Sequence, residues 1–386
     1  MQVAYAYEYP ADDIEVRSGH PFFMLRELEK RARVAKLFPL GRQHRYVFAP
    51  KLAYHKLRGR TYMPDREPLL LKSLAAQVTR RLNGSDADCL FSPSSCVASF
   101  LDIDLPKVFC ADATFANVID AYDEYRNCAP EYVRLAHAQE ARALANCAAA
   151  IYPSDWAARS AVEDYGADPA KIHVLPFGAN VAVPPADAVA RAIERRQFDP
   201  LRILFLGRDW WRKGGDVVLD ACGIAARNGV RLRLDIVGID QPPDPLPDFA
   251  ISHGNLLKSD PVQRRQLEEL LQRAHLLFVP SRAENYGIAF SEAAAFGVPS
   301  LSCAVGGIPT VVRSGISGIM LPAGSPPEAF ARTIQDCIAD RSRYNALAWS
   351  ARCFHDRRLS WDVFGEQLIG ILGQVSRRMP DLDAAQ

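Results

Sequence analysis

Short apolar runs alternate with longer, helix-like segments along the whole chain. Runs that are hydrophobic on both faces are typical of strands buried in a parallel sheet that helices cover. In the first half they are Val3–Tyr7, Tyr46–Ala49, Cys89–Ser92, Lys107–Cys110, Ala149–Pro153 and Ile172–Leu175, and in the second half Arg202–Leu206, Leu232–Val237, His275–Pro280, Val298–Ser302 and Ile319–Pro322. The two series predict an α/β fold with two parallel sheets.

A polar, proline-containing stretch from Val183 to Pro200 separates the two series. We therefore expect one domain over 1–185, a second over 186–364 and a terminal helix over 365–386, with a hinge near Pro200. Open α/β sheets bind ligands beyond the carboxyl ends of their strands, so the functional residues should lie in strand-to-helix loops.

The composition excludes several classes of protein. The 46 Lys and Arg nearly balance the 45 Asp and Glu, which leaves no basic field for nucleic acid. The nine cysteines contain no C-x-x-C pair and predict reduced thiols rather than disulfides or a zinc site. The acidic start does not resemble a signal peptide, and no apolar stretch reaches the roughly 18–20 residues of a membrane span. These features predict a cytoplasmic protein.

The first candidate motif is GRDWWRKGG, Gly207 to Gly215, directly after a predicted strand. The cations of Arg208 and Lys213, followed by a glycine pair that opens a helix, suit the binding of phosphate groups. The same letters also fit a solvated basic loop. Arg212 is a weaker candidate, since two neighbouring cations seldom both face a ligand.

The second motif is SRAENYGIAFSE, Ser281 to Glu292, which leaves a buried strand and enters a helix. Glu284 falls in the loop and can accept hydrogen bonds from hydroxyl groups. Glu292 falls about a turn into the helix, whose first amides, from Gly287 onward, can meet a phosphate. Alternatively, Glu284 caps the helix and Glu292 is favoured by its dipole.

A third, weaker motif is VGGIP, Val305 to Pro309, whose glycine pair can expose bare backbone to a ligand or simply form a turn. Together and in this order, the motifs resemble the nucleotide-sugar domain of retaining GT-B glycosyltransferases of family 4, the glycosyl transferases group 1. The resemblance covers roughly 200–365 and, more loosely, 149–180. Its segments are GRDWWRKGG, RLDIVG, SRAENYGIAFSEAAAFGVPSLSCAVGGIPTVVRSGISGIMLP and SWD at Ser360–Asp362.

The resemblance implies two Rossmann-like domains that face each other across a cleft, with the terminal helix crossing back to the first. Arg208 and Lys213 would hold the donor diphosphate. Glu284 would contact the donor sugar, and Glu292 the ribose. The remaining donor-binding positions implied are Gly207 of the first motif, His253, Asn255 and Leu256 in the loop that reads the base, and Tyr286, Gly287 and Ile288 at the start of the helix.

The first half offers two candidates for the acceptor side. Gly19, in a loop before the predicted helix Phe22–Arg33, could approach the donor phosphate or the acceptor, or could be an ordinary turn. Asp112 stands where relatives carry a cleft histidine. It could position the acceptor or take its proton, or it could cap the helix before Thr114. His20 could also line the cleft, although a lone histidine is more often structural.

A surface feature also points to a partner. Phe22–Leu25 is followed by the basic residues Arg26, Lys30, Arg31, Arg33 and Lys36. A basic amphipathic helix can lie weakly on the inner face of an anionic membrane, as a lipid-linked acceptor would require. A core-facing stripe with a solvated basic back is the preferred alternative.

The sequence thus predicts a retaining glycosyltransferase that uses a nucleotide diphosphate sugar and an unidentified glycan, lipid-linked or small-molecule acceptor. We expect no metal and no cofactor, because Asp102-Ile103-Asp104 matches a metal motif only by its letters. A phosphorylase or epimerase on the same scaffold is one alternative. A non-catalytic sugar- or nucleotide-binding protein is the other.

Overall fold

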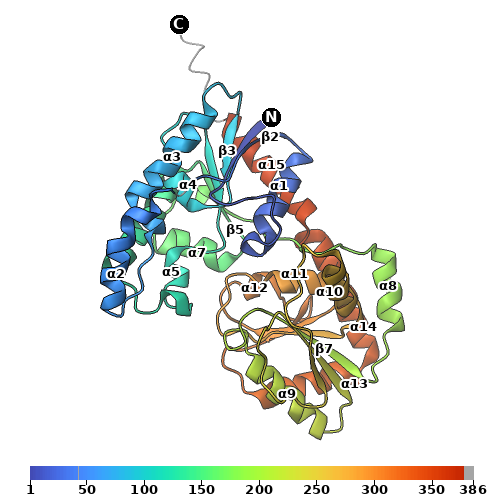
Figure 1. Ribbon diagram of the computed structural model, residues 1–386. Coiled ribbons are helices and arrows are strands. Elements are labelled where there is room, and N and C mark those ends of the chain that lie inside the picture. Colours follow the sequence, from blue (N-terminus) through green and yellow to red (C-terminus); the bar gives the residue numbers. More distant parts are fainter. Residues whose placement is uncertain (42, 378–386) are drawn as a thin grey trace. The chain divides into compact units, whose positions relative to one another are not determined.

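The computed structural model describes residues 1–41 and 43–377, and the side chains of 43–45 are left aside. It divides the chain into two compact units (Figure 1). The first contains Met1–Leu175 and the chain from Phe364 onward, and the second contains Pro176–Val363. The first division falls earlier than the position 185 expected from the sequence.

The first unit is built on a parallel sheet of six strands in the order β2-β1-β3-β4-β5-β6. Val3 of β1 pairs with Val34 on one side and with Cys89 on the other. The strands are β1 (Gln2–Ala6), β2 (Arg33–Leu37), β3 (Cys89–Ser92), β4 (Lys107–Cys110), β5 (Ala149–Tyr152) and β6 (Ile172–Val174).

Helices cover both faces of this sheet (Figure 1). Leu71, Leu74 and Val78 of α3 pack with the alanines of β1 on one face. On the other face, the Tyr5 hydroxyl donates to the carbonyl of Pro21 in α1 at 2.7 Å. The helices are α1 (His20–Glu29), α2 (Ala49–Leu57), α3 (Pro68–Leu82), α4 (Ser95–Ser99), α5 (Phe115–Val118), α6 (Pro130–Asn146), α7 (Asp155–Glu163) and α15 (Trp361–Arg377).

The second unit repeats the architecture with the strand order β12-β11-β10-β7-β8-β9, and the strand pairs in both sheets are parallel. The predicted α/β fold class is confirmed. Its strands are β7 (Leu201–Leu206), β8 (Leu232–Val237), β9 (Ala250–Ser252), β10 (Leu276–Phe278), β11 (Ser300–Cys303) and β12 (Gly318–Leu321). Its helices are α8 (Ala186–Arg195), α9 (Gly215–Arg227), α10 (Pro261–Arg273), α11 (Ile288–Ala295), α12 (Ile308–Val311), α13 (Pro327–Ala339) and α14 (Arg341–Arg358).

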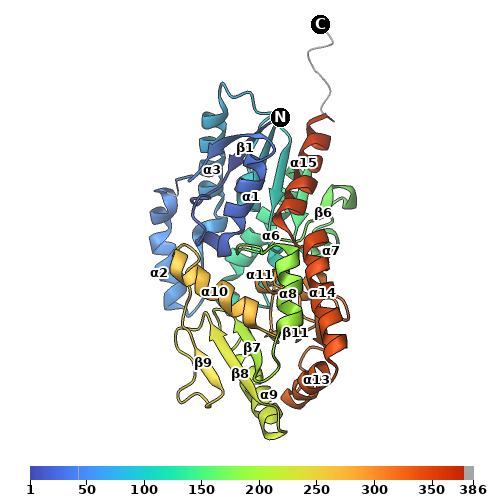
Figure 2. The same cartoon turned by 90° about the vertical axis from the view of Figure 1, so that its right-hand side faces the viewer.

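The polar stretch 183–200, which was expected to be a linker, contains α8. This helix buries Val189 and Ile193, four residues apart, against Tyr344 and Ala348 of α14. Figure 2 shows the two helices side by side. Most of α8 is polar because only one stripe of it meets the unit's core.

Two local predictions were wrong. Tyr46–Ala49 is not a strand, since a 3₁₀ helix (Gln43–Phe48) leads there into α2. The helix predicted over Phe22–Arg33 ends at Glu29, because β2 begins at Arg33.

The basic run after Phe22 is therefore not one helix face. Within it, Lys30 and Arg31 pair with the buried Glu27 at 2.5 and 2.6 Å, and Lys36 of β2 pairs with Glu29 at 2.6 Å. These contacts favour the alternative of a core-facing helix with paired charges. Among the described residues, no helix is both long enough and apolar enough to span a membrane.

Candidate functional site

The two charged motifs of the second unit meet in an ion pair between Lys213 and Glu284. Lys213 lies in the turn between β7 and α9, and Glu284 in the loop between β10 and α11. Since β7 and β10 are neighbours in a parallel sheet, their carboxyl ends bring these loops together. The Lys213 ammonium donates to the Glu284 carboxylate, and the side chains are only 12% and 9% exposed.

Glycines make this close approach possible. A Cβ atom at Gly207 would lie 2.8 Å from Cγ of Lys213. Gly214, at a φ of 74°, caps α9, and its Cβ would lie 2.4 Å from the Pro280 carbonyl oxygen. Larger residues at these two positions would push the lysine and the two loops apart.

The third motif, Val305 to Pro309, contacts the backbone of Glu284. The Gly307 amide donates to the Glu284 carbonyl at 3.0 Å. Gly306 has a φ of 53°, and its Cβ would lie 2.0 Å from the same oxygen. The VGGIP segment therefore holds the backbone of Glu284. Of the two interpretations of this motif, exposed backbone for a ligand or an ordinary turn, these contacts favour the turn.

A second ion pair joins Lys258 to Glu292. Gly287 caps α11 at a φ of 88°, Ile288 begins the helix, and Glu292 lies one turn later with its side chain 2% exposed. The Lys258 ammonium, from the loop between β9 and α10, donates to the Glu292 carboxylate. Sequence reasoning missed Lys258. The only signal for it was that a buried carboxylate needs a nearby cation.

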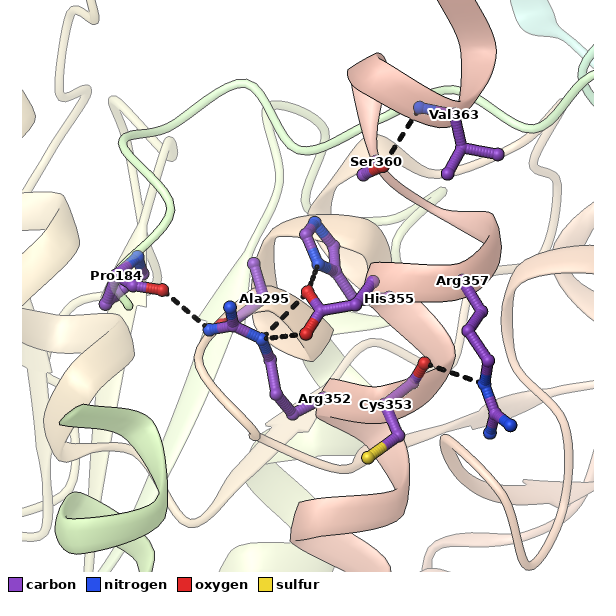
Figure 3. Close-up of polar contacts among 9 residues, drawn as sticks. Pro184, Ala295, Arg352, Cys353, His355, Arg357, Ser360 and Val363 are labelled. Carbon is purple, nitrogen blue, oxygen red and sulfur yellow. Dashed lines mark hydrogen bonds and ion pairs between the residues drawn. The ribbon is translucent and has the colours of Figure 1, made fainter. Parts of the chain in front are cut away.

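Two buried arginines hold the end of α11, just beyond Glu292. Arg352 donates to the carbonyls of Ala295 at 2.9 Å and Pro184 at 2.8 Å, and pairs with Asp356 at 2.9 Å (Figure 3). Arg196 donates to the carbonyls of Phe296 and Gly297 at 2.8 and 2.7 Å. These guanidinium groups satisfy carbonyls that a helix end leaves unpaired, so they fix the helix that carries Glu292.

The other cations of the first and second motifs have different roles. Arg208 has an exposed side chain in the turn after β7. Arg212 donates to the Ala283 carbonyl at 3.0 Å, which ties the first loop to the second. Arg282 makes a two-point contact with Asp216 at 2.8 and 2.7 Å. Although burial opposes it, the Arg282 guanidinium holds the pKa of Asp216 below its usual range.

Several residues expected to read the base or sugar have internal partners. His253 contacts Asp235 at 2.8 Å through Nε2, and Tyr286 donates to the Phe177 carbonyl at 2.7 Å. Leu256 is buried, whereas Asn255 is exposed. The contacts of His253 and Tyr286 favour a structural role for both side chains.

In the first unit, Asp112 pairs with His20. Asp112 follows β4 and is 33% exposed, and His20 begins α1 after Gly19, whose φ is 86°. His20 Nε2 lies 3.3 Å from Asp112 Oδ1. Burial lowers the pKa of His20, which Asp112 opposes and Arg17 reinforces, so the ring is neutral at neutral pH.

Asp112 is not the cap of the following helix, because Thr114 performs that function for α5. Within the described part of the chain, no three His, Cys, Asp or Glu side chains gather as a metal site would require. The structure thus pairs Glu284 and Glu292 with lysines in the second unit, and Asp112 with a histidine in the first.

Known proteins match both the sequence and the fold. Residues 188–353 match the family model for glycosyl transferases group 1. A D-inositol 3-phosphate glycosyltransferase of Xylanimonas cellulosilytica is 33% identical over 237 residues, 58% of this chain and 56% of that protein. One from Catenulispora acidiphila is 31% identical over 221 residues, 54% of this chain and 52% of that protein. The chain thus spans about half the length of these relatives.

Solved structures resemble the chain over its whole length. Sucrose-phosphate synthase of Thermosynechococcus elongatus has a TM-score of 0.69 at 17% identity, covering 100% of both chains. Anabaena Alr3699/HepE, solved in complex with UDP-glucose, has a TM-score of 0.63 at 15% identity over 97% of this chain and 100% of that chain. At such identities the likeness shows the fold, which is the GT-B fold expected from the sequence. The segment 188–353, which contains both ion pairs, is thus similar to the glycosyl transferases group 1.

Proposed function

We propose that this protein transfers a glycosyl group, with retention, from a nucleotide diphosphate sugar to an acceptor. The observation that carries the proposal is the buried Lys213–Glu284 pair, held between glycine turns at the carboxyl ends of β7 and β10. A lysine beside a carboxylate in such a place can serve two parts of one donor, its diphosphate and its sugar.

The chemistry requires such a cation. When the bond between sugar and phosphate breaks, negative charge grows on the departing diphosphate. Lys213 and Arg208 would stabilise that charge in the transition state, usually a large catalytic contribution. Glu284 would accept hydrogen bonds from sugar hydroxyls, and Glu292 from ribose hydroxyls. Donor binding would then exchange these lysine–carboxylate contacts for contacts with the donor.

The comparisons support the donor class. One similar structure was solved in complex with UDP-glucose, and the curated relatives are named for glycosyl transfer. Because these relatives are named for D-inositol 3-phosphate, this compound is the first acceptor to test. In the first unit, Gly19 and the Asp112–His20 pair would position the acceptor hydroxyl. We propose that the reaction needs no metal, since Lys213 and Arg208 provide the positive charge.

The first test is a thermal-shift screen of the purified protein with UDP, GDP, dTDP, ADP and CDP, alongside Lys213→Ala. A nucleotide present at about 100 times its Kd should stabilise the protein by about 2.7 kcal/mol. We expect one nucleotide to stabilise the wild type and to lose this effect in the variant. The matching nucleotide sugar should then release its nucleotide in the presence of an acceptor and a chelator, and NMR of the product should show the retained anomeric configuration.

Stabilisation by nucleotides without any transfer would instead favour a non-catalytic binding protein. No stabilisation by any of the five nucleotides, in a folded sample, would reject the donor site.

A further inference from the structure

Helix α2 of the first unit turns two of its polar side chains, Lys51 and His55, toward the rest of the unit. Lys51 donates to Glu67 at 2.5 Å and to Glu131 at 2.6 Å. His55 is 5% exposed, and its ring stacks on Tyr62 with 4.8 Å between ring centres. The face of α2 that meets the rest of the unit therefore carries charged and hydrogen-bonded side chains beside Leu52, which packs against a hydrophobic cluster that includes Tyr62.

Apart from Leu52, the apolar side chains of α2 are exposed to solvent. Pro50, Ala53, Tyr54 and Leu57 follow the i, i+3, i+4, i+7 spacing of one helical stripe and are all exposed. Leu57 is 89% exposed and Tyr54 is 49% exposed. A surface helix normally turns such a stripe toward the core, so α2 shows the reverse arrangement.

The turn before α2 extends this apolar surface. Tyr46 is 70% exposed and Val47 is 62% exposed. These two residues belong to the run that was wrongly predicted as a buried strand. Figure 1 shows α2 at the periphery of the first unit, away from the sheet. Contiguous exposed apolar side chains of this kind mark an interaction surface.

The charged side chains of the segment that carries this surface have one sign. No Asp or Glu occurs between Glu29 and Asp65 in the sequence. Lys56, Arg58 and Arg60 are exposed at the end of α2, and the Arg58 guanidinium lies 4.6 Å from the centre of the Tyr54 ring. A second copy of the same face would bring like charges together, whereas anionic headgroups complement them.

We propose that Tyr46, Val47, Tyr54 and Leu57, with Lys56, Arg58 and Arg60, form a surface that docks the first unit on an anionic lipid bilayer. The nine residues of α2 are too short to cross a bilayer, so the helix lies in the interface with its apolar side chains among the lipids. Resting on the proposed function, this docking points to a lipid-linked acceptor among the three acceptor classes.

The test is co-sedimentation of the full chain with vesicles of phosphatidylcholine alone and of phosphatidylcholine with phosphatidylglycerol, without nucleotide or acceptor. We expect binding to the phosphatidylglycerol vesicles, weakened by high salt. The double variant Tyr54→Ser, Leu57→Ser and the triple variant Lys56→Gln, Arg58→Gln, Arg60→Gln should each reduce binding by about tenfold or more.

Val262→Ser is the matched control, because Val262 is 76% exposed on α10 of the second unit. It should bind vesicles as the wild type does, and circular dichroism should show that every variant is folded. The docking proposal would be overturned if the folded wild type bound neither type of vesicle. It would also be overturned if the variants bound vesicles as well as the wild type does. The bilayer would also be rejected if the wild type bound no vesicles but formed dimers that dissociate in the Leu57 variant. That result would identify a second copy of the chain as the occupant of this surface. None of these results depends on transfer activity, which the nucleotide screen tests separately.

Discussion

Lys258 and Glu292 form an ion pair across 34 residues of sequence, with the carboxylate side chain 2% exposed. Removing one partner of a buried pair leaves the other charge uncompensated, which can cost about 3–5 kcal/mol. Because the lysine is 20% exposed, we expect Lys258→Met to cost less than this. The variant should also weaken nucleotide binding, since Glu292 would no longer be held in place.

Urea unfolding and nucleotide titration of Lys258→Met, Glu292→Gln and the double variant would measure this coupling. Lys258→Arg should recover part of the loss, because it keeps the charge. Independent, additive effects of the two single substitutions would show that the pair does not act as a unit.

Lys213 and Arg208 should both affect turnover, and Lys213→Ala should also lower stability because it leaves the buried Glu284 without its partner. Loss of one preorganised group that stabilises transition-state charge commonly costs about 10²–10³ in kcat. We expect Lys213→Ala and Arg208→Ala to show losses of this size in nucleotide release. Arg273→Ala is the control, since Arg273 lies on the exposed side of α10 and pairs with Glu269 at 3.4 Å. Full activity in both site variants would mean that the diphosphate binds elsewhere.

The Asp112–His20 pair should act on the acceptor and not on the donor. Asp112 raises the pKa of His20 against the effect of burial, so Asp112→Asn should lower that pKa further. The acid limb of the kcat/KM profile for the acceptor should then move to lower pH, with a loss of up to about a hundredfold from poorer positioning. Nucleotide affinity, measured on the same samples, should not change. If the acid limb of this profile does not move, His20 has no role in the reaction.

Gly306 should be less replaceable than other glycines in the left-handed region. Gly315 has a φ of 77° and open space around its missing Cβ, whereas a Cβ at Gly306 would meet the Glu284 carbonyl at 2.0 Å. Gly315→Ala should cost about 1–2 kcal/mol from backbone strain alone. Gly306→Ala should cost more and also raise KM for the donor, because Glu284 must shift. Equal losses of stability and an unchanged KM would contradict this.

The chain should lose stability in mild acid through His275. Burial lowers the pKa of this histidine from its ordinary 6.5 to about 4, and its Nδ1 accepts from the Arg202 amide at 3.0 Å. The unfolded chain therefore binds the proton first as the pH falls. The contribution is complete above pH 6.5 and is lost as the pH falls to 4, at most about 3 kcal/mol.

His275→Asn keeps a hydrogen-bond acceptor but does not titrate in this range. Urea unfolding of wild type and variant across these pH values should give curves that converge as the pH falls. A constant difference between them would exclude His275 as the cause.

The sequence predicts the inner strands well but misses two of the four outer strands. Cys89–Ser92, Lys107–Cys110 and Leu232–Val237 have the predicted bounds, because strands covered on both faces are apolar throughout. β2 and β9 were missed, and each is an outer strand of its sheet. Outer strands are partly exposed and can carry charged residues. Their residue pattern therefore does not distinguish them from helices or loops.

The site shows the same limit. The sequence motifs name Lys213, Glu284 and Glu292, and the structure adds which residues contact them. Lys258 could not be found, since its partner Glu292 lies on α11 and no fixed spacing links the two. His20 was considered as a lone histidine, and only the fold brings it to Asp112.

The path of the chain has a consequence for biosynthesis. The first unit is interrupted at Leu175 and is completed only by α15, whose Phe364, Leu368 and Leu372 are buried at 1%, 0% and 0% exposure. During translation, all of Pro176–Val363 leaves the ribosome before these side chains do. The second unit can therefore fold first, while the apolar surface reserved for α15 stays uncovered and open to chaperones. The first unit is therefore the first to be synthesised and the last to be completed.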